Sequence, residues 1–171
     1  SSHCCDSVGN VMAHAEFLCD HTKDSRFDLA QRLIEDLPGN GSIIVYSNFE
    51  KTIINALATA FPSLAASLES LVGRIVDLQD IIIKNFYHPN FDGSVSLKST
   101  LPALVPDMSY SSLAIGEGET AMVTFAYLAM GRYGSESADA ERRNLLEYCK
   151  QDTLAMVKLH ERLDEYVRGV G

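Results

Sequence analysis

Apolar side chains recur along the chain with two different periods, which together predict a mixture of strands and helices. Residues 1–17 alternate around the pair Gly9-Asn10, a turn signal, and this predicts a β-hairpin. Residues 42–46 form a short, nearly continuous apolar run, which is typical of a strand buried on both faces. Residues 75–78 are short and β-branched, and they predict a strand end or a turn.

The other periodic segments carry apolar residues three and four positions apart, which is typical of amphipathic helices. They cover residues 24–37, 48–61, 63–71, 96–104, 119–130 and 137–166. We expect the apolar-rich helix over residues 119–130 to lie in the core. The order of elements predicts one α/β domain over residues 1–171, in which helices flank a small mixed sheet.

The last predicted helix carries a phenol and a carboxylate on one face. Tyr148 and Asp152 are four residues apart, so their side chains project from the same side of a helix. Leu145, Cys149 and Met156 can pack this helix onto a sheet. Because a carboxylate near a packed face is costly unless it is paired, this pair is a candidate for chemistry.

Composition and charge limit the class of protein only loosely. A hydrophobic share of 46% in 171 residues indicates a globular chain, and no apolar run approaches the ~20 residues of a membrane span. No secretory signal is visible, and the four cysteines lack metal-site spacing, so we expect reduced thiols and a cytoplasmic location. The net charge of −9 opposes broad nucleic-acid binding, but it is compatible with a local acidic site.

Acidic residues occur where predicted strands end and helices begin. Glu50 follows the strand at residues 42–46, Asp77 lies at the second strand end, and Asp152 lies on the last helix. Carboxylates so placed can meet at one edge of a sheet. Their oxygens suit Mg²⁺ or Mn²⁺, and two such ions can activate a water and neutralise a phosphodiester leaving group. A tyrosine one turn before Asp152 could orient that water.

Several phrases of the sequence resemble the DnaQ-like 3′–5′ exonucleases of the ribonuclease H-like superfamily. The pair Tyr148 and Asp152 is similar to the last motif of their four-acid set, and Ser47-Asn48-Phe49-Glu50 is similar to the second. More narrowly, the chain resembles a bacterial domain family of unknown function assigned to that superfamily. The phrases are Gly41-Ser42-Ile43-Ile44-Val45-Tyr46, Tyr87-His88-Pro89, Leu101-Pro102-Ala103-Leu104-Val105-Pro106 and Tyr148-Cys149-Lys150-Gln151-Asp152.

This resemblance implies a role for each matching residue. Asp152 and Glu50 would bind Mg²⁺ or Mn²⁺, although Glu50 stands where the second motif normally has Asp. Tyr148 would orient the attacking water. Asn48 and Lys98 would contact the substrate, a single-stranded nucleic-acid end. The implied fold is the ribonuclease H-like mixed sheet, and the implied activity is metal-dependent hydrolysis of phosphodiesters.

The first motif of that superfamily, Asp-x-Glu on a strand ahead of the hairpin, does not occur here. Asp6 and Glu16 have the wrong spacing to replace it. We therefore expect an N-terminally truncated fragment that lacks its first strand, binds metal weakly or not at all, and is nearly inactive. Because a missing central strand exposes a sheet edge, we also expect self-association into a homo-oligomer.

Simpler interpretations stand beside each of these assignments. Tyr148 and Asp152 could be an ordinary pair on a helix surface, and Asn48 and Asp77 could be helix caps. Lys98 could be a solvated surface lysine. The whole domain could be a non-catalytic module that binds nucleic acid or protein and keeps the fold without the chemistry.

Overall fold

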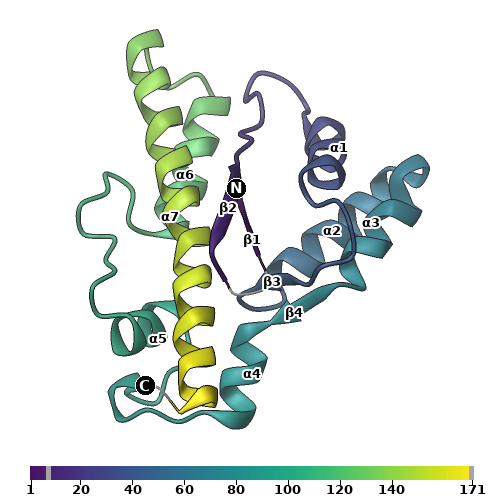
Figure 1. Cartoon of the computed structure of the whole chain (residues 1–171). Helices are drawn as coiled ribbons and strands as arrows, with labels where there is room; N and C mark the ends of the chain where they lie inside the picture. The colour runs from purple at the N-terminus through teal and green to yellow at the C-terminus, as the bar shows by residue number, and fades with distance from the viewer. Residues whose placement is uncertain (7–8, 170–171) are drawn as a thin grey trace. The chain divides into compact units, whose positions relative to one another are not determined.

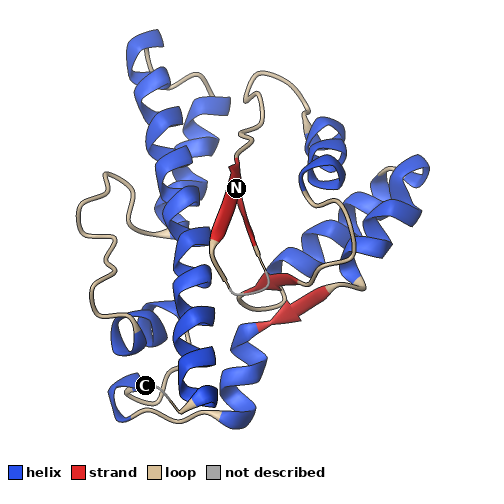
Figure 2. Ribbon diagram, viewed as in Figure 1, coloured by secondary structure: helices blue, strands red, loops and turns tan. Residues whose placement is uncertain are grey.

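The computed structural model describes residues 1–6 and 9–169 and contains two compact units. The first unit consists of Ser1–Ser25 with Ser109–Ala155, and the second of Arg26–Met108 with Met156–Gly171. The described residues contain seven α-helices, two two-stranded sheets and two short 3₁₀ helices, Pro62–Leu64 and Pro89–Phe91 (Figures 1 and 2). Across the same residues, no helix combines the length and the apolar character that a membrane span requires. The α/β class expected from the sequence is confirmed.

The first unit combines the N-terminal hairpin with two helices. β1 (Ser2–Cys5) and β2 (Val11–Ala15) pair antiparallel, so that His3 lies opposite His14. α6 (Gly118–Ala129) and the first part of α7 (Ser135–Arg168) complete the unit. Its apolar core is built on the buried residues Ile115, Leu128 and Leu145.

The hairpin was predicted from the alternation around Gly9-Asn10, and its two strands are confirmed. The Asp6 carboxylate accepts hydrogen bonds from the backbone N–H of Asn10 at 2.9 Å and from its amide Nδ2 at 3.0 Å. Gly9 has φ +93°, a conformation that glycine adopts without steric cost. The predicted turn also includes Ser7 and Val8, which lie outside the described residues.

The second unit places helices around a short parallel strand pair. β3 (Ile43–Val45) and β4 (Ile75–Asp77) pair in register from Ile43–Ile75 to Val45–Asp77. A crossover of two helices joins them, as parallel strands require. The helices of this unit before the C-terminal part of α7 are α1 (Arg26–Asp36), α2 (Phe49–Ala60), α3 (Ala65–Val72), α4 (Leu78–Asn85) and α5 (Leu97–Leu104).

Two apolar clusters hold this second unit together. One lies among α1, α2 and α3, and its most buried members are Ala30 and Leu68, both 0% exposed. The other joins α4 and α5 to the C-terminal part of α7 through Ile82, Leu104 and Leu159. Ile43 and Ile75 of the strand pair pack against the first cluster and Ile44 packs against the second, so the strand pair contacts both clusters.

The expectation of one mixed sheet needs correction. The described strands form two separate two-stranded sheets, whereas the sequence predicts one mixed sheet. Periodicity identifies a strand but carries no information about its partner, and here each strand pairs only with its neighbour in the same unit.

The helix α6 is buried on one face only. Thr124 and Leu128 are buried, while Met122 and Val123 are 66% and 44% exposed. The expectation that the helix over residues 119–130 lies in the core is confirmed for the face that carries Leu128 and is wrong for the opposite face, because apolar content alone does not say how many sides of a helix are covered.

Candidate functional site

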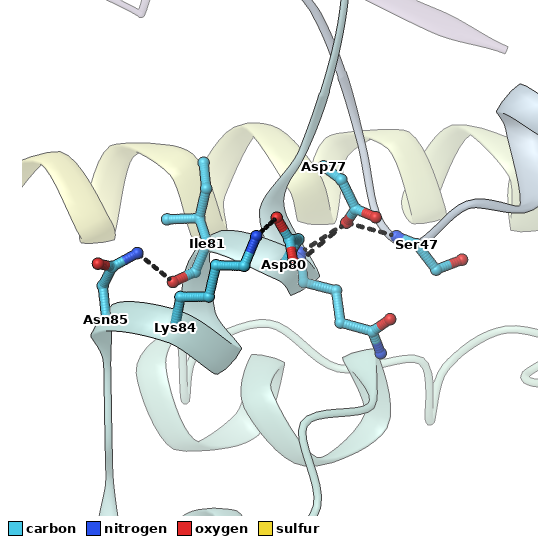
Figure 3. Close-up of polar contacts among 7 residues, drawn as sticks. Ser47, Asp77, Asp80, Ile81, Lys84 and Asn85 are labelled. Carbon is cyan, nitrogen blue, oxygen red and sulfur yellow. Dashed lines mark hydrogen bonds and ion pairs between the residues drawn. The ribbon is translucent and has the colours of Figure 1, made fainter.

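Asp77 lies where the carboxyl ends of β3 and β4 meet, and its side chain joins them (Figure 3). One carboxylate oxygen, Oδ1, accepts hydrogen bonds from the backbone N–H groups of Ser47 and Gln79, both at 2.9 Å, and of Asp80 at 3.3 Å. The bonds to Gln79 and Asp80 cap α4, and the bond to Ser47 fixes the chain as it leaves β3. The interpretation of Asp77 as a cap is confirmed.

The segment after β3 leads directly to two predicted site residues. Ser47 has φ +85°, a left-handed conformation that is uncommon for a residue with a side chain. Asn48 follows at the N-cap position of α2 and is exposed; among the described residues its side chain makes no capping hydrogen bond. Glu50 lies in the first turn of α2, where the helix dipole favours a carboxylate, and its Oε2 atom is buried.

Lys98 lies in the first turn of α5 and is exposed. Nearby, the hydroxyl of Tyr46 at the end of β3 donates to the carbonyl oxygen of Val95 at 2.6 Å and lies 2.8 Å from the hydroxyl of Thr100. These bonds tie the start of α5 to β3. Asn48, Glu50, Asp77 and Lys98 thus all belong to the second unit.

Tyr148 and Asp152 lie in the first unit, one turn apart on α7, and a third residue joins them. The hydroxyl of Tyr110 donates to Oδ1 of Asp152 at 2.8 Å. The rings of Tyr110 and Tyr148 pack with their centroids 6.1 Å apart. Tyr110 is the functional candidate that the sequence does not reveal, because the local sequence around it carries no information about a contact 42 residues further along the chain.

The electrostatics of this cluster follow from burial. Desolvation raises the pKa of the Asp152 carboxyl, and the hydrogen bond from Tyr110 opposes the rise. Burial, and then the charge of Asp152, raises the pKa of Tyr148 to about 12. The same two causes, in the same order, raise the pKa of Tyr110 well above its ordinary value. Both phenols therefore keep their protons at neutral pH, and that of Tyr110 donates to Asp152.

Asp152 and Glu50 are the carboxylates that the sequence predicts as metal ligands. Within residues 1–6 and 9–169, no group of three or more His, Cys, Asp or Glu side chains is arranged to hold a metal ion. Asp152 belongs to the first unit and Glu50 to the second. The Asp152 carboxylate is a hard oxygen donor of the kind that Mg²⁺ and Mn²⁺ bind, and a complete site needs further ligands. No disulfide joins the four cysteines in the described part of the chain.

Comparison with known proteins identifies a family. A family model described as "Domain of unknown function (DUF2779)" matches residues 1–96. This is more than half of the 171 residues, so the chain belongs to that family. No curated protein matches the chain, and no solved structure does. The matched segment contains Asn48 and Glu50 but ends before Lys98, Tyr148 and Asp152.

Proposed function

We propose that this member of the family is a metal-dependent nuclease domain of the 3′–5′ exonuclease type, which acts on single-stranded nucleic-acid ends. The observation that supports it best is the half-buried polar cluster that Tyr148 and Asp152 of α7 form with Tyr110. Asp152 keeps a carboxylate in a desolvated position and receives a hydrogen bond from Tyr110 at 2.8 Å. Tyr148 lies one turn away, as in the superfamily that the sequence resembles.

The residue roles in this proposal follow the resemblance. Asp152 and Glu50 are proposed as the metal-binding carboxylates for Mg²⁺ or Mn²⁺, and Asn48 and Lys98 as contacts to the nucleic-acid strand. The phenol of Tyr148, protonated at neutral pH, is proposed to orient the attacking water. Two further carboxylates, an Asp-x-Glu pair, are needed and do not occur near the hairpin in this sequence. We therefore expect these 171 residues alone to bind metal weakly and to have little or no activity.

The experiment measures metal binding and degradation together. Mn²⁺ is titrated into the chain by calorimetry, with and without the substitutions Asp152→Asn and Glu50→Gln. Single-stranded DNA and RNA labelled at the 5′ end are then incubated with the chain and with any longer product of the same reading frame. We expect weak Mn²⁺ binding that each substitution reduces, and shortening from the 3′ end only in a product that supplies Asp-x-Glu. The nuclease proposal fails if such a product leaves both substrates intact, or if Asp152→Asn leaves its activity unchanged.

A second proposal is a non-catalytic module that binds nucleic acid or protein. It is favoured by one observation, the lack of a three-ligand metal group within the described residues. This module would bind a single-stranded oligonucleotide equally well in EDTA and in Mn²⁺, and Asp152→Asn would not change the affinity. Self-association through an unpaired strand edge also stays a proposal, which light scattering over a concentration series tests.

A further inference from the structure

The turn at residues 109–113 is fixed to α7 at two neighbouring points. Tyr110 donates to Asp152 at 2.8 Å, and the amide Nε2 of Gln151 donates to the carbonyl oxygen of Ser109 at 3.1 Å. Because Gln151 and Asp152 are adjacent on the helix, the two bonds hold one short stretch of α7 against one short turn. The whole arrangement lies within the first unit.

The turn has its own internal support. The backbone N–H of Ser111 donates to the hydroxyl of Ser109 at 3.1 Å, and the backbone N–H of Leu113 donates to the carbonyl oxygen of Tyr110 at 3.0 Å. The Tyr110 ring is half-buried and packs on the ring of Tyr148. Its hydroxyl is therefore presented to Asp152 from a constrained backbone and a constrained ring.

An aspartate side chain on a helix has several rotamers available, and a hydrogen bond selects among them. The phenol of Tyr110 uses Oδ1, so a rotamer change at Asp152 would break a charge-assisted bond of 2.8 Å. Such bonds to charged groups contribute more than neutral ones, and their loss leaves a desolvated carboxylate without that donor. The orientation of the second oxygen, Oδ2, is then set by the same bond.

We propose that Tyr110 is a positioning residue, which holds the Asp152 carboxylate in one orientation through its hydroxyl group. Its importance for activity rests on the proposed nuclease function, but the positioning itself does not. Partners that hydrogen-bond a liganding carboxylate typically change metal affinity by 10–100-fold when they are removed. Tyr110→Phe should therefore weaken any Mn²⁺ binding at Asp152 by roughly that factor.

The test separates the hydroxyl from the ring. Tyr110→Phe deletes only the donor and keeps the aromatic packing, and Tyr148→Phe is the matched control on the other ring. The χ1 rotamer of Asp152 is read from three-bond NMR couplings in the unaltered chain and in both variants. We expect a single rotamer in the unaltered chain and in Tyr148→Phe, and averaging over at least two rotamers in Tyr110→Phe. An unchanged rotamer in Tyr110→Phe, or equal averaging in both variants, would overturn the proposal.

A second measurement does not depend on the folding of Tyr110→Phe. The tyrosine Fermi doublet in the Raman spectrum reports whether a phenol is a strong donor, and it is compared between the unaltered chain and Asp152→Ala. We expect the intensity ratio of one tyrosine to move away from the strong-donor value in Asp152→Ala; an identical doublet contradicts the proposal. If the rotamer result holds while Asp152→Asn leaves Mn²⁺ binding unchanged, the nuclease proposal fails and the positioning role survives. If Asp152→Asn abolishes Mn²⁺ binding and Tyr110→Phe moves neither the binding nor the rotamer, only the positioning role fails.

Discussion

Replacement of Asp77 by alanine should be among the most destabilising polar substitutions in the second unit. The Asp77 carboxylate accepts three backbone N–H groups at 2.9, 2.9 and 3.3 Å, from the end of β3 and from the start of α4. Loss of an N-cap costs about 0.5–2 kcal/mol. Loss of a hydrogen bond to a charged acceptor costs about 1.5–3 kcal/mol. These two effects share one side chain, so we expect a total decrease in the free energy of unfolding of roughly 2–4 kcal/mol.

The assay is equilibrium unfolding in urea, followed by far-UV circular dichroism, with thermal melts in parallel. For a chain of this size the expected loss lowers Tm by roughly 5–15 °C. Asp77→Asn keeps an acceptor oxygen and should lose much less. Asp80→Ala is the matched control, because Asp80 is exposed and its ion pair with Lys84 at 2.6 Å contributes no more than about 1 kcal/mol. If Asp77→Ala lies within about 0.5 kcal/mol of the unaltered chain, Asp77 does not hold the two strand ends together.

Three further predictions use the same unfolding measurements or amide exchange. Ser47→Gly should raise the free energy of unfolding by up to about 1 kcal/mol, because φ +85° is strained for serine and allowed for glycine. A loss of stability would show that the serine hydroxyl matters more than the strain. Burial raises the pKa of Asp152, so its stabilising contribution is present below the unfolded-state pKa and is lost as pH rises through the folded-state pKa. Asp152→Asn, which is neutral at every pH, should gain stability relative to the unaltered chain from acidic to neutral pH, and parallel stability curves would refute this. Burial, and then the charges of His14 and Lys150, lower the pKa of His3 in the folded chain. The neutral imidazole therefore contributes stability above its unfolded-state pKa of about 6.5, and this contribution is lost as pH falls below that value. The protection factors of the amides in β1 and β2, which correct for the pH dependence of the intrinsic exchange rate, should therefore fall at acidic pH in the unaltered chain and less so in His3→Gln.

Local elements were predictable where one short-range signal dominates. The hairpin, the strand at residues 43–45 and the long last helix all follow from alternation or from apolar spacing, and α7 extends only a few residues beyond the predicted 137–166. The pairing of β3 with β4 was not predictable in the same way. It depends on how α2 and α3, which lie between the two strands in the sequence, pack in the first apolar cluster of the second unit. The exposed face of α6 has a similar origin, since the number of neighbours around a helix is a tertiary property.

The candidate site shows the same division between local and distant information. The placement of Tyr148 and Asp152 on one helical face, and the capping role of Asp77, follow from spacing and from position at an element end. Tyr110 could not be found, because its role depends on a loop that returns to α7 from 42 residues earlier in the chain. The exposure of Asn48 was not predictable either. Its position before α2 predicts a side-chain cap, and its side chain makes no capping hydrogen bond to the described residues.

The contrast between Asp77 and Asp152 indicates which carboxylate calls for a functional explanation. Every feature of Asp77 is accounted for by structure, because its oxygen satisfies three N–H groups that would otherwise lack a partner at a strand end and a helix start. The Asp152 carboxylate accepts one hydrogen bond, from the phenol of Tyr110. An asparagine at this position could accept the same bond without the cost of a desolvated negative charge. Stability alone would thus favour the amide at position 152. A negative charge in this position is useful when something positive binds to it, and this reasoning supports Asp152, rather than Asp77, as the candidate ligand for a cation.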